Sequence, residues 1–97
     1  MTRSIGIALL LTFSACGSGP PVQEMSDARQ AIAVAREAGA ENHAAEDLNA
    51  AEEYLERAQR NLSERAYGDA RRDALRAKLK ALDALAATEN PEHRERL

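Results

Sequence analysis

The chain has 97 residues, with 13 Lys and Arg against 16 Asp and Glu, and a formal net charge of −3. This length allows one small domain. Aromatic residues make up 3% and Trp is absent, so the chain cannot fill an all-β core or stack bases as nucleic-acid modules do. The single Cys excludes a disulfide framework and a Cys-based zinc site. We therefore expect a helical protein that binds no nucleic acid, because its net negative charge opposes contact with phosphate backbones.

The N-terminal segment has the layout of a secretory signal peptide. Arg3 supplies a positive start, residues 5–13 are uncharged and mostly apolar, and small residues follow. The apolar run is far shorter than the about 20 residues that a membrane-spanning helix needs. The residues that resemble the bacterial lipobox are Phe13, Ser14, Ala15 and Cys16. We expect residues 1–15 to be removed as a signal peptide.

The lipobox resemblance implies a lipid anchor at Cys16. In this class the Cys receives a diacylglyceryl thioether and, after cleavage, an acyl chain such as palmitate on its new amino group. Residues 16–21 then form the lipidated Cys and a flexible Gly-, Ser- and Pro-containing tether. Gly17 stands where an Asp would favour inner-membrane retention in enteric bacteria, so we expect the inner leaflet of the outer membrane, facing the periplasm. The alternative is an ordinary secreted protein with Cys16 near the cleavage site.

Residues 22–90 are expected to form an all-α domain. Apolar residues recur at steps of three and four. The predicted helices cover about residues 22–38, 44–64 and 67–88. Gly39 is expected to end the first helix, and Asn42 or His43 to lie near the N-cap of the second. Residues 91–97 form a charged tail after Pro91, which cannot continue the helix. The fold class is a small three-helix bundle, or a helical hairpin with a separate N-terminal helix.

The third predicted helix carries two apolar stripes on different sides. One contains only alanine: Ala70, Ala74, Ala77, Ala81 and Ala84. The other is Leu75, Leu79, Leu82 and Ala86. The alanine stripe suits the second helix, because the short connection predicts an antiparallel hairpin, in which Arg60 lies near Asp73. The leucine stripe is expected to pack on the first helix, with a second molecule or a partner helix as the alternative.

Several segments together resemble a bacterial family of helical lipoprotein domains called domain of unknown function 4398. They are residues 27–35, with Asp27-Ala28-Arg29-Gln30-Ala31, residues 38–40, with Ala38-Gly39-Ala40, residues 48–58, with Leu48-Asn49-Ala50-Ala51-Glu52-Glu53-Tyr54, and residues 67–72, with Tyr67-Gly68-Asp69-Ala70. The resemblance covers about residues 22–88. It implies a helical lipoprotein domain without a known catalytic site.

The residue types that carry catalysis are sparse in this sequence. His43 is the only His within the predicted fold, and no second His follows at the spacing of a zinc-binding helix. Ser63 and Thr88 fall at helix ends, and the paired carboxylates are typical of a solvated helix face. We therefore expect no enzyme activity, no cofactor, no metal and no small-molecule substrate.

The third predicted helix holds the best candidate interaction surface. Its members are Leu75, Leu79, Leu82, Arg72, Arg76 and Lys80. The basic residues of this helix are either the ordinary polar face of the helix or a site for an anionic partner.

We expect a lipid-anchored, non-catalytic cell-envelope protein that serves as a structural or interaction module. Its expected partners are the membrane, through Cys16, and a second copy or another envelope protein. The alternatives are a peptidoglycan-associated spacer and an accessory regulator of an envelope enzyme. The chain ends in Arg96-Leu97 and not in the Lys that joins the small murein lipoprotein to the cell wall, which disfavours covalent attachment.

Overall fold

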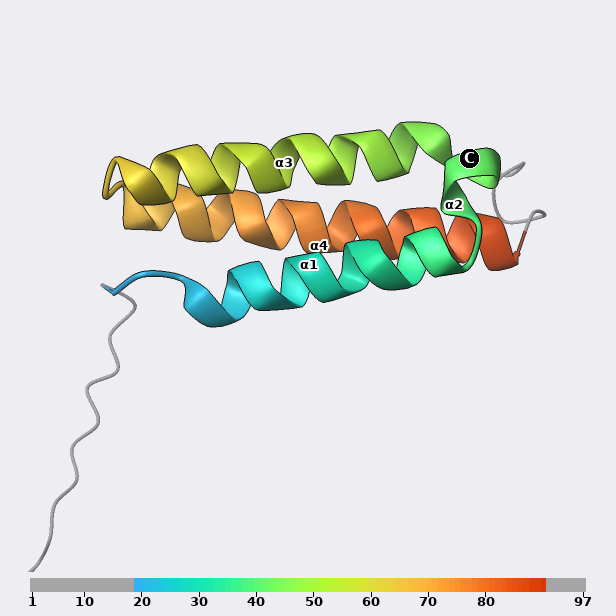
Figure 1. The fold of residues 1–97 in the computed structure, drawn as a ribbon, viewed down its shortest axis with the longest axis horizontal. Helices are drawn as coiled ribbons and strands as arrows, with labels where there is room; N and C mark the ends of the chain where they lie inside the picture. The colour runs from blue at the N-terminus through green and yellow to red at the C-terminus, as the bar shows by residue number, and fades with distance from the viewer. Residues whose placement is uncertain (1–18, 91–97) are drawn as a thin grey trace, which may run out of the picture.

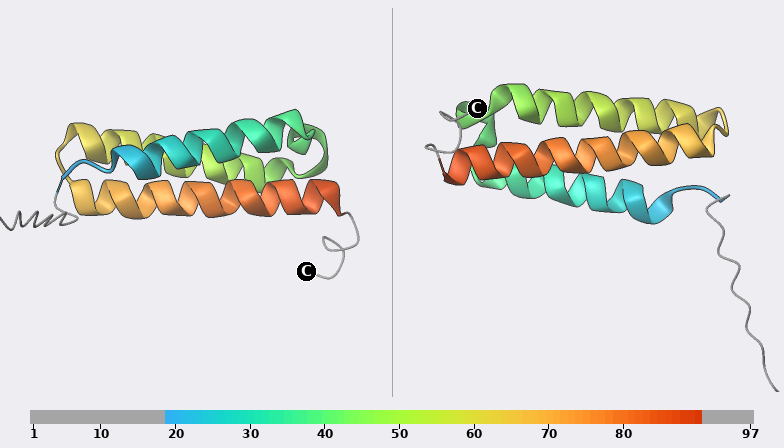
Figure 2. Two further views of the ribbon diagram at one scale, coloured as in Figure 1. Left: turned by 90° about the horizontal axis from the view of Figure 1, so that it is seen from below. Right: turned by 180° about the vertical axis from the view of Figure 1, so that it is seen from behind.

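The computed structural model describes residues 19–90 as an all-α fold, as the sequence predicts. Its helices are α1 (Val22–Glu37), α2 (Ala40–His43), α3 (Ala45–Ser63) and α4 (Tyr67–Glu89), and this part of the chain contains no strand. The three long helices lie side by side, with α1 and α4 running in one direction and α3 in the other (Figures 1 and 2). No helix between residues 19 and 90 combines the length and apolarity needed to cross a membrane.

The long helices begin and end within one residue of the expected ranges. Gly39 ends α1 as predicted, in a left-handed conformation with a φ of 98°. The short helix α2, which the sequence did not predict, follows at once and contains Asn42 and His43. The residue before α3 is instead Ala44, and no side chain caps that helix. His43 thus lies next to the N-cap, as expected, but neither it nor Asn42 caps α3 with its side chain, because both belong to a helical turn of their own.

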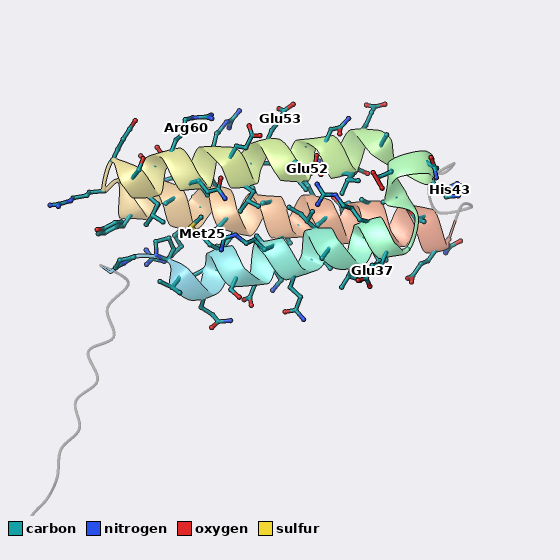
Figure 3. The ribbon with its side chains drawn as sticks, in the orientation of Figure 1. Met25, Glu37, His43, Glu52, Glu53 and Arg60 are labelled. Atoms are coloured by element: carbon teal, nitrogen blue, oxygen red, sulfur yellow. The ribbon has the colours of Figure 1, made fainter. Side chains whose placement is uncertain are left out.

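The core is built mainly from alanine. Every member of the predicted alanine stripe of α4 is completely buried, and larger core residues are few, among them Met25, Ile32 and Leu48. One cluster joins Ile32 and Ala35 of α1, Leu48 and Ala51 of α3, and the second half of the α4 stripe. Met25 fills the other end of the bundle with Ala58 and Ala74 (Figure 3). Alanine seams allow helix axes to approach to about 8 Å, so α4 lies closely against both neighbours.

The leucine stripe of α4 does not pack on α1. Leu75 is 46% exposed, Leu79 is 59% exposed and Leu82 is 41% exposed. The expectation failed because the alanine stripe accommodates both neighbouring helices. α1 brings its own small residues, Ala28, Ala31 and Ala35, against the bundle core and leaves the leucines outside.

A buried polar contact marks the register of the α3–α4 hairpin. The Nδ2 atom of Asn61 donates a hydrogen bond of 2.8 Å to the Oδ2 atom of Asp73, which is 6% exposed. The expected neighbour of Asp73 was Arg60, so the register is right to one residue. The neutral amide takes this place because Asn61 faces the seam while Arg60 is exposed and points outward from α3 (Figure 3). The turn passes through Arg65, whose φ of 62° is left-handed.

Gly39 and Gly68 form a matched pair for testing the role of the α1 end. Gly39→Ala is expected to lower the free energy of unfolding by about 1–2 kcal/mol, because an L side chain is strained in the left-handed region. A Cβ there meets nothing nearer than 3.6 Å, so only the backbone conformation opposes it. Gly68→Ala, in an exposed helical position, should instead be stabilising by about 0.5 kcal/mol. Urea denaturation followed by circular dichroism measures both changes. An equal loss in both variants would contradict this assignment.

Arg65→Gly tests the turn between α3 and α4. Glycine adopts a positive φ without steric cost, so this change should raise the free energy of unfolding by up to about 1 kcal/mol. Arg65→Ala removes the same side chain and retains the strain, so it serves as the control and should change stability little. A stabilisation by both variants would point to the charge of Arg65 and not to its backbone.

Candidate interaction surface

The outer side of α4 presents a row of leucines that we call the leucine face: Leu75, Leu79 and Leu82. These side chains lie one helical turn apart, because residues three and four positions apart fall on the same side of a helix. Each is about half exposed although the alanines of the same helix are completely buried. The helix therefore has an apolar core side and a second apolar side that residues 19–90 leave uncovered.

The apolar surface continues from α4 onto α1. Val34 of α1 is 42% exposed and lines a shallow open groove with Leu82. Asp27, Gln30 and Lys78 complete the rim of this groove. Val34 was not among the residues that the sequence pattern predicted for this surface. The available signal was its position, because Val34 is a large aliphatic residue outside the buried side of α1.

The basic residues of α4 separate to different edges of the leucine face. Arg76 lies toward α3, where its guanidinium carbon is 5.9 Å from the centre of the Tyr54 ring and its Nη1 atom is 4.0 Å from the Oδ1 atom of Asp73. Lys78 lies on the opposite edge, in the groove beside α1. Arg72 is at the N-terminal end of the row, 57% exposed, and its Nη1 atom is 3.0 Å from the Oδ1 atom of Asp69.

The expected surface is thus brought together in part. Arg72 and Arg76 adjoin the leucine face, whereas Lys80 is half-buried and lies farther round the helix on the α3 side. The basic residues form separate edges of an apolar face and not one cationic patch.

Arg71 does not belong to this surface, because it connects the beginning of α4 to α1 and to the residues before α1. Its Nε atom is 3.3 Å from the Oε2 atom of Glu24 in α1. Its Nη2 atom donates a hydrogen bond of 2.8 Å to the carbonyl oxygen of Gly19. The residues that lead into α1 are therefore held against the beginning of α4. Pro21, which is fully buried, fills the space at this end.

The side chains suited to catalysis lie on three different helices, with Ser63 on α3 and Thr88 on α4. His43 is on α2 at the far end of the bundle (Figure 3). The hydroxyl groups of Ser63 and Thr88 donate to backbone carbonyl oxygens of their own helices, those of Arg60 and Ala84. No group of three or more His, Cys, Asp or Glu in the described range 19–90 is arranged to hold a metal ion.

Comparison with known protein families shows which family this fold belongs to. The family model described as domain of unknown function 4398 matches residues 23–97, which include all four helices except the first residue of α1. The chain belongs to this family. No curated protein and no solved structure matches the chain. In this chain, the domain of unknown function 4398 is a helical bundle with a core built mainly from alanine and with the leucine face on its outside.

Ala77 and Leu79 form a matched pair for testing this geometry. Ala77→Leu is expected to lower the free energy of unfolding by about 1–3 kcal/mol, because a closely packed seam has no room for the added carbons. Leu79→Ser should change it by no more than about 0.5 kcal/mol in dilute solution, because Leu79 lies at the surface. Urea denaturation checks both. A large loss with Leu79→Ser would show that another part of the same chain covers this residue.

Proposed function

We propose that the protein is a lipid-anchored, non-catalytic module of the bacterial cell envelope that works by binding another protein surface. The observation that carries this proposal is the leucine face, with Val34 beside it, on the outside of an otherwise closed bundle. Contiguous exposed apolar residues with a polar rim are typical of interaction sites. Arg72, Arg76 and Lys78 provide such a rim.

The proposed anchor is at Cys16, which lies outside the described residues together with Phe13, Ser14, Ala15 and the rest of the signal peptide. It rests on the lipobox pattern and on the position of the only Cys in the chain. Two or more acyl chains hold a protein stably on a membrane. The absence of Asp after Cys16 supports the inner leaflet of the outer membrane, with the bundle in the periplasm.

The non-catalytic part of the proposal rests on how the reactive side chains are used. Nucleophilic catalysis needs a hydroxyl or thiol beside a base. The Ser63 and Thr88 hydroxyls are bonded to helix carbonyls, and His43 is on a different element from both. The groove beside Leu82 is shallow and open, unlike the enclosed pockets that hold small substrates.

Mass spectrometry of the mature N-terminus tests the anchor. The expected product begins at Cys16 and carries the added mass of a diacylglyceryl group and an acyl chain. The Cys16→Ser variant should retain residues 1–15, because cleavage of this class of signal peptide follows lipidation. Ser18→Ala is the matched control and should be processed normally. An unmodified Cys16, or a mature chain that begins elsewhere, would overturn the anchored function.

A further inference from the structure

The exposed seam of α4 has a charge pattern that is complementary to itself in the reverse direction. Its positions, at alternating steps of three and four, are Arg72, Leu75, Leu79, Leu82, Ala86 and Glu89. All six are exposed. The seam begins with a cation and ends with an anion, and its apolar residues lie between them. Such spacing is the pattern by which two helices pack along a shared seam.

We propose that the occupant of the leucine face is a second copy of the same chain, packed with its α4 antiparallel to the first. This inference rests on the proposed interaction function and names its partner. When the two helices cross midway between Leu79 and Leu82, each Leu79 lies against Leu82 of the second copy. Leu75 then lies against Ala86, so the apolar residues meet each other throughout.

The charges select the antiparallel direction. In this arrangement Arg72 of each copy meets Glu89 of the other at both ends of the seam. A two-fold axis perpendicular to α4 also brings together the edges that adjoin α3 in the two copies. Arg76 and Asp83 share that edge, since they are seven residues apart on the helix, so Arg76 of each copy lies beside Asp83 of the other. A parallel pair would instead place Arg72 against Arg72 and Glu89 against Glu89.

The two-fold axis keeps α1 on the same side of both copies. Val34, which is level with Leu82 in the groove, then adds apolar surface beside the Leu79 of the second copy. The contact is one helix face, about 34 Å long and about 10 Å wide. The area of such a face is smaller than the about 800 Å² that each partner buries in a standard interface, so the dimer is expected to be weak in solution. Confinement of both copies to one membrane raises the effective concentration and favours the pair.

Single-cysteine cross-linking of the full chain in bacterial cells tests this geometry. Leu79→Cys and Leu82→Cys lie near the crossing point, where equivalent residues of the two copies are about 5 Å apart along the helix axis. A short bis-maleimide should therefore give a product of twice the chain mass with either variant. Arg72→Cys alone should give none, because its equivalents are about 25 Å apart along the axis. Cells that produce both Arg72→Cys and Glu89→Cys chains should give the linked pair.

The remaining outcomes overturn the proposal. Self-linking of Arg72→Cys as readily as Leu79→Cys would show a parallel pair. Linkage of Leu79→Cys to a protein of another mass would show a different partner, and no linkage at all would show an unpaired face. Glu53→Cys, exposed on the outer side of α3, is the background control (Figure 3).

The unsubstituted chain separates failure of the dimer from failure of the anchor. A lipidated Cys16 has no free thiol, so that chain should not react with maleimide. A reaction there would refute the anchor, and the same positions are then tested with Cys16→Ser in every chain. The matched charge exchange is independent of the anchor. Arg76→Glu should reduce the linked fraction of Leu79→Cys several-fold, and adding Asp83→Arg should restore it.

Discussion

The packing of α4 against two helices at once, through side chains no larger than methyl groups, is the constraint on which the rest of the structure depends. Ala70, Ala74, Ala77, Ala81 and Ala84 are all completely buried. Each contributes little apolar area, and small domains bury a modest share of their surface to begin with. Stability therefore requires contact along the whole length of the helices, which explains why α1, α3 and α4 are long and nearly side by side.

A seam of identical small residues says little about how far one helix should slide along the next. The polar contacts supply that information, because each pair of long helices carries one. Arg36 pairs with Glu52 between α1 and α3, Arg71 pairs with Glu24 between α4 and α1, and Asn61 bonds Asp73 between α3 and α4. Two of these are exposed or half-exposed ion pairs, which contribute little to stability. Their contribution is to favour one register of the alanine seams over its neighbours.

The sequence was sufficient to predict the long helices and the two apolar sides of α4, because periodicity shows which residues share a side of a helix. It was insufficient for the partner of each face. Leu79 and Ala77 are both apolar. Nothing in their spacing reveals that the methyl-sized side chain packs at the contact with both neighbouring helices, while the larger side chain packs against neither. Helix α2 was not predicted because four residues are too few to display a helical period, although Gly39 correctly marked the end of α1. Val34 was missed for a similar reason, since its role depends on a neighbouring helix.

The hydrogen bond from Arg71 to the Gly19 carbonyl oxygen shortens the part of the linker that can span the distance from Cys16 to the bundle. By sequence, residues 17–21 separate Cys16 from the first helix. Because the bundle holds Gly19, only the bonds from Cys16 to Gly19 span the gap, and a fully extended chain covers about 10 Å over that distance. A lipid on Cys16 would therefore keep the beginning of α1 and α4 within the thickness of one helix from the anchoring point. At that distance, this end of the bundle would lie beside the membrane surface.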